Sequence, residues 1–201
     1  MNGIPRRRLS KSDRHAQLLE TARELIREAG TDELTLGRLA EHAGVTKPLV
    51  YDHFGDRSGI LAELYRAFEA RQHDALSAAL DSAGPGLPAV ASVVAGAYID
   101  CGLAEGRELA GVVAALAGSA TLSRLRQEAE DAYLVRCRQT LEPLCGPIDA
   151  AGLHALIGAG DALTRNALDG RISADRARTV LTRVLIALVT DDGHDPTETT
   201  R

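Results

Sequence analysis

The fold is decided by the stretch TLGRLAEHAGVTKPLVYDHFGDRSGIL, residues 35–61. Apolar residues recur at helical spacing on both sides of a glycine, and they are Leu39, Ala40, Val45, Val50 and Phe54. Gly44 can take the positive φ that a tight turn between two helices needs. The spacing predicts two short helices, over 35–43 and 47–54, that pack through their apolar faces. This pattern is typical of a helix-turn-helix.

Helical periodicity continues on both sides of this stretch. A helix is predicted over 12–29, and Gly30 is a natural residue to end it. Further helices are predicted over 57–80, 88–103, 106–118, 120–145, 147–169 and 174–190. The aromatic content is only 3%, and this composition also favours helix over sheet. We therefore expect an all-α protein of about nine helices, with an N-terminal three-helix helix-turn-helix domain followed by a C-terminal helical bundle.

Charge is unevenly distributed along the chain. The net charge of the 201 residues is −5, yet residues 1–14 hold five basic side chains and one acidic one. A basic arm on an acidic body can bind a polyanion at one end only. Arg6, Arg7 and Arg8 could lie along phosphates or enter a minor groove, as N-terminal arms do in other DNA-binding domains. The alternative is that the arm is a solvated, disordered tail.

Several kinds of site and segment are not indicated by the sequence. Cys101, Cys137 and Cys145 are too irregularly spaced for a zinc site or a redox pair, and an odd, low cysteine count fits a reducing cytoplasm. The N-terminus lacks the apolar segment of a signal peptide. The apolar region 87–118 is interrupted by a proline and by charges, which favours a buried helix over a membrane span. We expect a cytoplasmic protein with no metal site, no cofactor and no membrane partner.

The exposed face of the predicted helix 47–54 carries side chains suited to DNA. Lys47 offers a point charge for phosphate or donors for guanine, and Tyr51 offers a hydroxyl for a phosphate or a base edge. Leu49 either contacts a thymine methyl group or packs against the first helix. His53 either donates to a phosphate or is partly buried and caps backbone carbonyls. These alternatives remain open from the sequence.

The same stretch resembles the TetR family of bacterial repressors. The resemblance lies in Ala40, Ala43-Gly44-Val45, Tyr51, His53-Phe54 and Arg57, and in the leading helix from Ala22 to Gly30. It covers about residues 14–65, and the later helices match the family only in number, length and order. The resemblance implies a homodimeric transcriptional repressor that binds double-stranded DNA and is released by a small molecule. It also implies that the basic residue Arg57 contacts phosphate.

Four positions depart from the family pattern. Gly37 lies where relatives often carry a larger polar side chain facing the DNA. Asp52 is acidic close to the DNA surface, and Ser58-Gly59 replaces the usual charged pair.

The predicted DNA-binding set combines the arm, the helix starts and the recognition helix. Thr35 and Thr46 belong to it, although capping of the two helix starts is the alternative role of both. Backbone N–H groups at the start of the helix after Asp56 add to the anion site that Arg57 is expected to form. The complete set is Arg6, Arg7, Arg8, Thr35, Thr46, Lys47, Pro48, Leu49, Tyr51, His53 and Arg57.

The predicted division has three parts: the arm and helix-turn-helix over 1–58, a ligand-binding and dimerisation domain over 59–191, and a polar tail over 192–201. One short helix-turn-helix binds weakly, so a dimer is expected to read the two half-sites of a near-palindromic operator. Apolar stripes on the last two helices suit a four-helix dimer interface. The predicted interface residues are Leu153, Leu156, Ile157, Gly160, Val180, Leu181, Val184 and Leu188. The alternative is that these stripes pack inside one subunit.

The helices between these parts are expected to enclose a pocket for a small-molecule effector. The candidate lining residues are Tyr98, Asp100, Cys101, Tyr133, Cys137 and Asp161. Because rings are few, an aliphatic or small polar ligand is favoured over a flat polycyclic one. An enzyme is not expected, since the chain has no Gly-rich phosphate loop, GxSxG or HExxH motif. The alternative function is an all-helical ligand-binding or scaffold protein without sequence-specific DNA binding.

Overall fold

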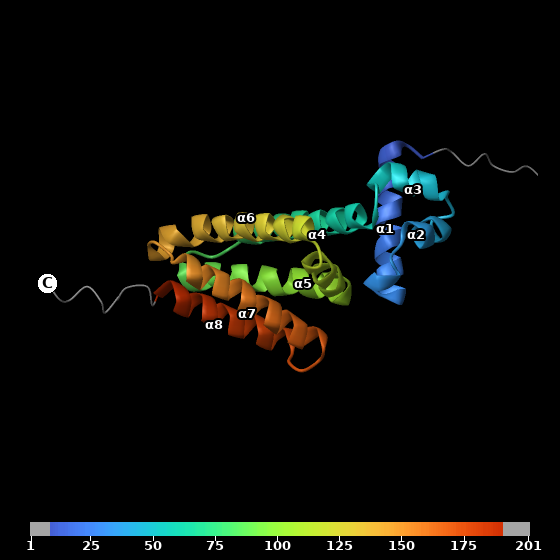
Figure 1. Ribbon diagram of the computed structural model, residues 1–201. Coiled ribbons are helices and arrows are strands. Elements are labelled where there is room, and N and C mark those ends of the chain that lie inside the picture. Colours follow the sequence, from blue (N-terminus) through green and yellow to red (C-terminus); the bar gives the residue numbers. More distant parts are fainter. Residues whose placement is uncertain (1–8, 191–201) are drawn as a thin grey trace, which may run out of the picture. The chain divides into compact units, whose positions relative to one another are not determined.

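The computed structural model describes residues 9–190, and within them every regular element is a helix (Figure 1). In chain order these are α1 (Lys11–Ala29), the 3₁₀ turn η1 (Thr31–Glu33), α2 (Leu36–His42), α3 (Lys47–Phe54), α4 (Arg57–Asp81), α5 (Leu87–Ala117), α6 (Ala120–Cys145), α7 (Ala150–Leu168) and α8 (Ala174–Thr190). The backbone of α5 is broken at Gly106, where φ is 63° and ψ is −152°. The two helices predicted on either side of this residue are therefore both present, and the all-α fold class is confirmed. The basic arm with Arg6, Arg7 and Arg8 and the tail over 192–201 lie outside the described residues.

Capping chemistry sets several of the helix ends. Ser10 accepts a hydrogen bond from the Asp13 amide at 3.0 Å and begins α1. Gly30 ends this helix with φ at 85°. The helix predicted from Pro147 begins instead at Ala150, because the Asp149 side chain accepts from the Gly152 amide at 3.0 Å and caps it.

The chain folds into two compact units. Of the described residues, unit 1 comprises 9–67 and 107–123, and unit 2 comprises 68–106 and 124–190. The sequence predicts a functional boundary after residue 58, between the DNA-binding part and the ligand-binding part. This boundary stays a prediction.

Unit 1 is built around α1, with α2 and α3 packed beside it (Figure 1). Its largest fully buried side chains come from α1, the segment before α2, α2 itself, α4 and the last part of α5, and they are Leu18, Leu25, Leu34, Leu39, Ile60, Leu61 and Leu116. Burial of one such side chain contributes about 1.5–3 kcal/mol to folding. This shared core holds α2 and α3 in a fixed orientation.

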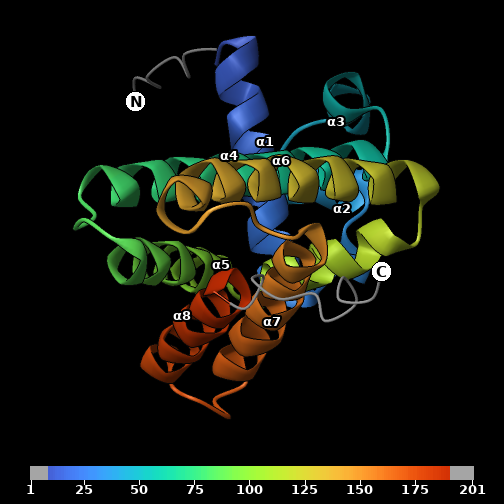
Figure 2. The ribbon, with the colours of Figure 1, turned by 90° about the vertical axis from the view of Figure 1, so that its left-hand side faces the viewer.

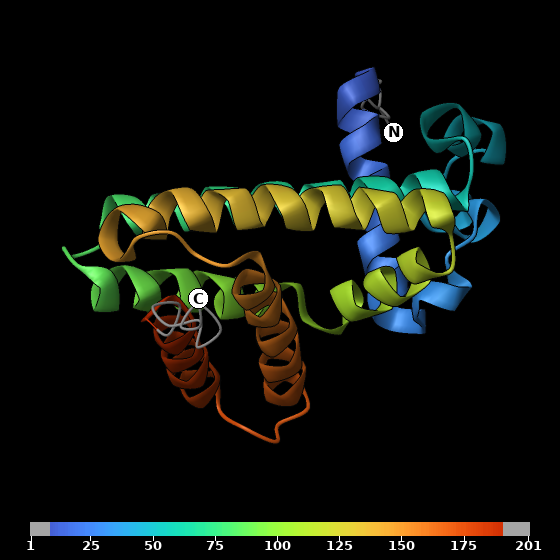
Figure 3. The same cartoon turned by 60° about the vertical axis from the view of Figure 1, so that its left-hand side comes forward.

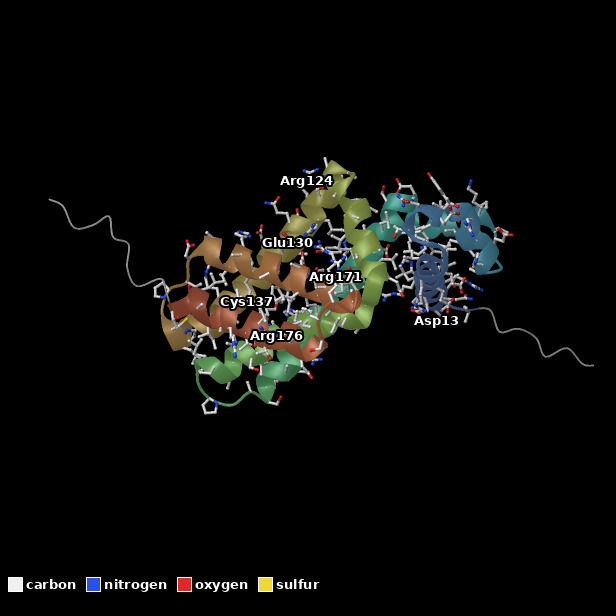
Figure 4. All side chains as sticks on the ribbon, turned by 90° about the horizontal axis from the view of Figure 1, so that it is seen from below. Asp13, Arg124, Glu130, Cys137, Arg171 and Arg176 are labelled. Carbon is white, nitrogen blue, oxygen red and sulfur yellow. The ribbon has the colours of Figure 1, made fainter. Side chains whose placement is uncertain are left out.

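Unit 2 contains the larger apolar core, to which α4, α5, α6, α7 and α8 all contribute. The α7 and α8 helices lie side by side as a hairpin (Figures 2 and 3). Cys137 of α6, labelled in Figure 4, is fully buried in this core. One segment, Leu87–Gly106, is long and apolar enough to cross a membrane by length and composition alone. Four of its residues, Ala91, Val94, Ala95 and Ile99, are almost completely buried in the core, as in the central helix of a folded bundle.

Candidate nucleic-acid interface

The turn between α2 and α3 is fixed by backbone chemistry. Thr35 caps α2 by accepting a hydrogen bond from the Arg38 amide at 3.2 Å. Gly44 takes a φ of 63°, and the Val45 amide donates to the Ala40 carbonyl at 2.9 Å. Gly55 ends α3 with φ at 73°. The two helices predicted from the sequence are therefore present with the predicted turn.

One face of α3 is buried and the opposite face is exposed. Val50 is completely buried and Phe54 almost so. The exposed face carries Lys47, Pro48, Tyr51 and Asp52, and 63% of the Tyr51 surface is open to solvent. A tyrosine left this exposed on a short, well-anchored helix is available for a partner, because its ring contributes nothing to the core.

The other predicted DNA contacts of α2 and α3, Thr35, Thr46 and Leu49, differ in exposure and in hydrogen bonding. Thr35 and Thr46 are both exposed. Thr46 occupies the N-cap of α3, but within the described residues its side chain makes no capping hydrogen bond. Its hydroxyl is therefore open to another acceptor or donor. Leu49 is half-buried, so part of its side chain packs on unit 1 and part is exposed to solvent.

Arg57 has backbone partners that the sequence did not indicate. Its Nε donates to the Leu34 carbonyl at 3.0 Å, and its Nη2 donates to the Thr31 carbonyl at 2.9 Å. The guanidinium thereby ties the start of α4 to the turn between α1 and α2. These bonds give Arg57 a positioning role, and the phosphate contact that the resemblance implies stays a prediction.

The start of α4 also approaches α3 closely. Asp56 caps α4 by accepting from the Gly59 amide at 2.8 Å. A Cβ atom at Gly59 would lie only 1.9 Å from the Phe54 carbonyl oxygen. The glycine that departs from the family pattern is therefore required by this close backbone approach.

His53 contacts a histidine rather than the backbone carbonyls considered above. Its Nδ1 lies 3.3 Å from Nδ1 of His15, and Nε2 of His15 lies 2.5 Å from Oε2 of Glu63. Burial lowers the pKa of His53 below its usual value, and the neighbouring His15 and Lys11 lower it further. Sequence periodicity could not have found this cluster, since its members come from α3, α1 and α4.

The candidate pocket residues gather in unit 2. The Tyr98 hydroxyl donates to Asp161 at 2.7 Å, and the Tyr98 and Tyr133 rings meet edge to face with centroids 5.6 Å apart. Burial raises the pKa of Cys137 to about 12 and that of Cys101 to about 11, so both thiols stay protonated. The pKa of Tyr133 is also raised well above its usual value by burial.

Asp161 is the charged member of this cluster, and it lies 3.6 Å from Nη2 of Arg126. The Thr164 hydroxyl is buried nearby on α7 and has no hydrogen-bond partner among the described residues. Asp100 is exposed and instead pairs with Arg178 of α8. The structure therefore brings together the candidates Tyr98, Tyr133 and Asp161, and leaves Asp100 outside.

The predicted dimer residues divide into two groups. Five of the eight are buried in the core of unit 2 itself, and they are Leu153, Leu156, Ile157, Gly160 and Leu181. A Cβ atom at Gly160 would lie 2.5 Å from Cε1 of Tyr98, so this glycine admits a ring of its own subunit. These residues pack inside their own subunit, because an apolar stripe on a terminal helix must first cover its own core, and a dimer role for them stays a prediction. Val180, Val184 and Leu188 are half-buried.

Comparison with known proteins shows which family model and which repressor the chain resembles. A family model described as "Bacterial regulatory proteins, tetR family" matches residues 18–64. Over 56 residues the chain is 38% identical to the tetracycline repressor protein class A from transposon 1721 of Escherichia coli. The matched segment is 28% of this chain and only 26% of the length of that repressor.

Solved structures resemble nearly the whole chain. A protein from Pseudomonas aeruginosa PAO1, provisionally named a transcriptional regulator, has a TM-score of 0.76 at 19% identity and covers 90% of this chain and 93% of its own. A TetR-family transcriptional regulator from Streptomyces coelicolor has a TM-score of 0.72 at 17% identity, with 90% and 96% covered. A TetR-like regulator from Rhodococcus sp. RHA1 has a TM-score of 0.70 at 22% identity, with 90% and 97% covered. At these identities the likeness establishes the fold.

Proposed function

We propose that the chain is a regulator of the TetR family, whose model matches residues 18–64, and that it represses transcription by binding operator DNA through the exposed face of α3. The observation that carries this proposal is the anchoring of α3, with Val50 fully buried and Tyr51 mostly exposed. A helix held this way can enter a major groove without rearranging the core. The acidic chain as a whole, at net charge −5, would not attract DNA by itself.

Each exposed group of α3 has a chemical role in this proposal. The Lys47 ammonium binds a phosphate or a guanine edge, and the Tyr51 hydroxyl binds a phosphate or base. The free Thr46 hydroxyl and the backbone at the α3 start suit an anion. Pro48 and the exposed part of Leu49 offer apolar contact to a thymine methyl group. Arg6, Arg7 and Arg8 add contacts from the arm.

The proposed regulator is a homodimer, because one helix-turn-helix reads too few base pairs for useful affinity. We place its interface on the outward faces of α7 and α8 rather than on their buried stripes. The outward face of α7 carries the small residues Ala151, Ala155, Gly158 and Ala162. Together with the half-buried Val180 and Val184 of α8, these allow two helix pairs to approach and form a four-helix interface.

A small-molecule effector would act through unit 2. The cluster of Tyr98, Tyr133 and Asp161 presents ring edges, a carboxylate and the nearby unpaired Thr164 hydroxyl, which together suit a small, partly polar ligand. Such a ligand releases DNA if it binds the DNA-incompetent conformation more tightly by a few kcal/mol. The proposed location of this regulator is the cytoplasm, where bacterial operator DNA lies.

Selection of binding sites from random DNA by the full-length protein tests the proposed function. We expect an enriched near-palindrome whose half-sites are separated by about one helical turn or a multiple of it. Absence of any enriched sequence at low salt, from a folded dimer, would contradict DNA-binding regulation. It would favour the alternative of an all-helical ligand-binding or scaffold protein.

A further inference from the structure

A line of three side chains connects three helices of unit 1. Glu63 of α4 lies 2.5 Å from Nε2 of His15 on α1, and Nδ1 of His15 lies 3.3 Å from Nδ1 of His53 on α3. The His15 ring also lies against Phe54, with centroids 4.8 Å apart. All three side chains of the line are partly buried. The line therefore ends on the helix proposed to read DNA.

The line restricts where protons can sit. An ionised Glu63 only accepts, so Nε2 of His15 carries a proton. One proton then lies between the two Nδ1 atoms, since two bare nitrogens or two N–H groups would repel each other. That proton belongs either to His53, with His15 neutral, or to His15, with His15 cationic.

These two states differ at the other nitrogen of His53. In the neutral state the single ring proton of His53 is on Nδ1, which donates to Nδ1 of His15. Its Nε2 is then a bare acceptor that repels a phosphate oxygen. In the cationic state Nδ1 of His53 accepts from His15, and its Nε2 carries a proton that can be donated. Within the described residues, Nε2 of His53 makes no hydrogen bond, so it is free for an outside acceptor.

We propose that Glu63 and His15 are positioning residues that make His53 a phosphate donor, so that operator binding takes up one proton. The proposal rests on the proposed function and names a regulation of the same interface. Glu63 is essential to the proton uptake, because its carboxylate can only accept from Nε2 of His15 and its negative charge stabilises the cation.

The charged groups around the pair come from the three helices that surround it. Lys11 and Arg14 on α1 disfavour a proton on His53, and Asp52 on α3 favours one. Burial and His15 itself act in the same direction as the α1 cations, and the pKa of His53 is lowered. A proton on His53 in addition to one on His15 is thereby disfavoured.

The sign of the pH dependence follows from the proposed proton uptake. If the bound form holds one proton more than the free form, affinity increases as pH falls, and it levels off once the free pair has gained that proton itself. Linkage limits the change to about tenfold in Kd for each pH unit, which is the limit for one proton. At higher pH the free energy of binding includes a growing cost of protonating the pair.

The Glu63→Gln variant separates a proton linkage from a structural role. A glutamine amide can donate to Nε2 of His15, which leaves the proton of a neutral His15 on Nδ1 and gives His53 the same donating Nε2. This variant should bind the operator without proton uptake, and its Kd should be nearly independent of pH. His53→Gln should bind more weakly and also lose the pH dependence. His73→Gln, which alters an exposed histidine of α4, is the matched control.

The experiment measures fluorescence anisotropy of the selected operator with full-length protein from pH 6 to 8.5, at constant ionic strength. We expect Kd to fall several-fold with each unit decrease in pH for the parent protein and for His73→Gln, and to stay flat for Glu63→Gln. Equal slopes for the parent protein and Glu63→Gln would overturn the inference and leave the proposed function intact. No binding by the parent protein at any pH would instead remove the proposed function.

A second measurement keeps the inference testable if Glu63→Gln folds poorly. Long-range ¹H–¹⁵N correlation spectra of the parent protein report which ring nitrogen of each histidine carries a proton. In the DNA complex we expect His53 protonated on Nε2 and bare on Nδ1, and His15 protonated on both. A His53 protonated on Nδ1 in the complex would contradict the inference.

Discussion

α3 and α7 are both helices with one buried face, and they differ in what they present outward. α3 presents Lys47, Tyr51 and Asp52, whereas α7 presents a row of small residues that includes Ala155 and Gly158. A buried apolar stripe indicates only that a helix packs against its own chain. The outward face indicates the kind of partner: the Lys47 ammonium and the Tyr51 hydroxyl suit a polyanion, and small groups suit the close approach of another helix.

The difference explains why apolar periodicity separates the exposed face of α3 from its buried face but does not identify an outward interface on α7. For α3 the predicted contacts Lys47, Pro48 and Tyr51 lie on the exposed face. For α7 and α8 they were chosen from the apolar stripe, and Leu153, Leu156 and Leu181 proved to be core. The outward face of α7 had no pattern that periodicity alone could separate from an ordinary solvated surface.

The largest expected effect tests whether the α8 stripe belongs to the subunit core. Leu181 is 1% exposed, so Leu181→Ala should lower the free energy of unfolding by about 2–5 kcal/mol. Val184→Ala, at a half-buried neighbouring position, should lower it by about 1 kcal/mol, in the range usual for single substitutions. Urea denaturation at one fixed protein concentration measures both. Similar losses for the two variants would show that the stripe is not divided as described.

A second substitution tests the outward face of α7. No atom lies within 4 Å of a Cβ at Gly158, so Gly158→Arg should fold, and a helix interior accepts arginine better than glycine. If the dimer forms through this face, the variant should be monomeric by sedimentation. Its affinity for a two-half-site operator should then fall about a hundredfold or more, as the second site no longer contributes.

Ala78→Arg on the surface of α4 is the control for this substitution. The control should remain a dimer with unchanged affinity for the operator. A Gly158→Arg variant that also stays dimeric would move the interface to another surface.

A third pair of substitutions compares two glycines of unit 1. Gly59→Ala places a Cβ against the Phe54 carbonyl and should cost about 1–3 kcal/mol of stability, as overpacking does. Gly37→Ala adds a Cβ in open space, 3.9 Å from Thr35 Oγ1, and should stabilise α2 by about 0.5–1 kcal/mol. Thermal unfolding should move the two midpoints in opposite directions. A stable Gly59→Ala protein would mean that the approach of α4 to α3 can relax.

Local chemistry made much of the fold predictable from the sequence. Thr35 as a cap, and Gly44 and Gly55 with positive φ, fix the ends of α2 and α3, and each of these residues acts within a few positions of its own. The start of α7 was missed, because Asp149 caps it whereas Pro147 alone suggested an earlier beginning.

Contacts between distant segments could not be predicted in this way. Arg57 donates to the Leu34 carbonyl 23 residues away, in a 3₁₀ connection that apolar periodicity does not mark. His15 meets residues that are 38 and 48 positions away, and the sequence offers three scattered polar side chains with no shared spacing. Such contacts depend on how helices pack, and only the folded structure brings them together.

The salt dependence of operator binding by Lys47→Ala tests the central claim most directly. Lys47 is exposed at the start of α3 and lies outside the core, so the variant should keep the parent stability. If its ammonium neutralises a phosphate, the slope of log K against log salt should decrease in magnitude by about one, with weaker binding across all sequences. An unchanged slope and unchanged affinity, from a folded dimeric variant, would contradict the assignment of the α3 face as the surface that reads DNA.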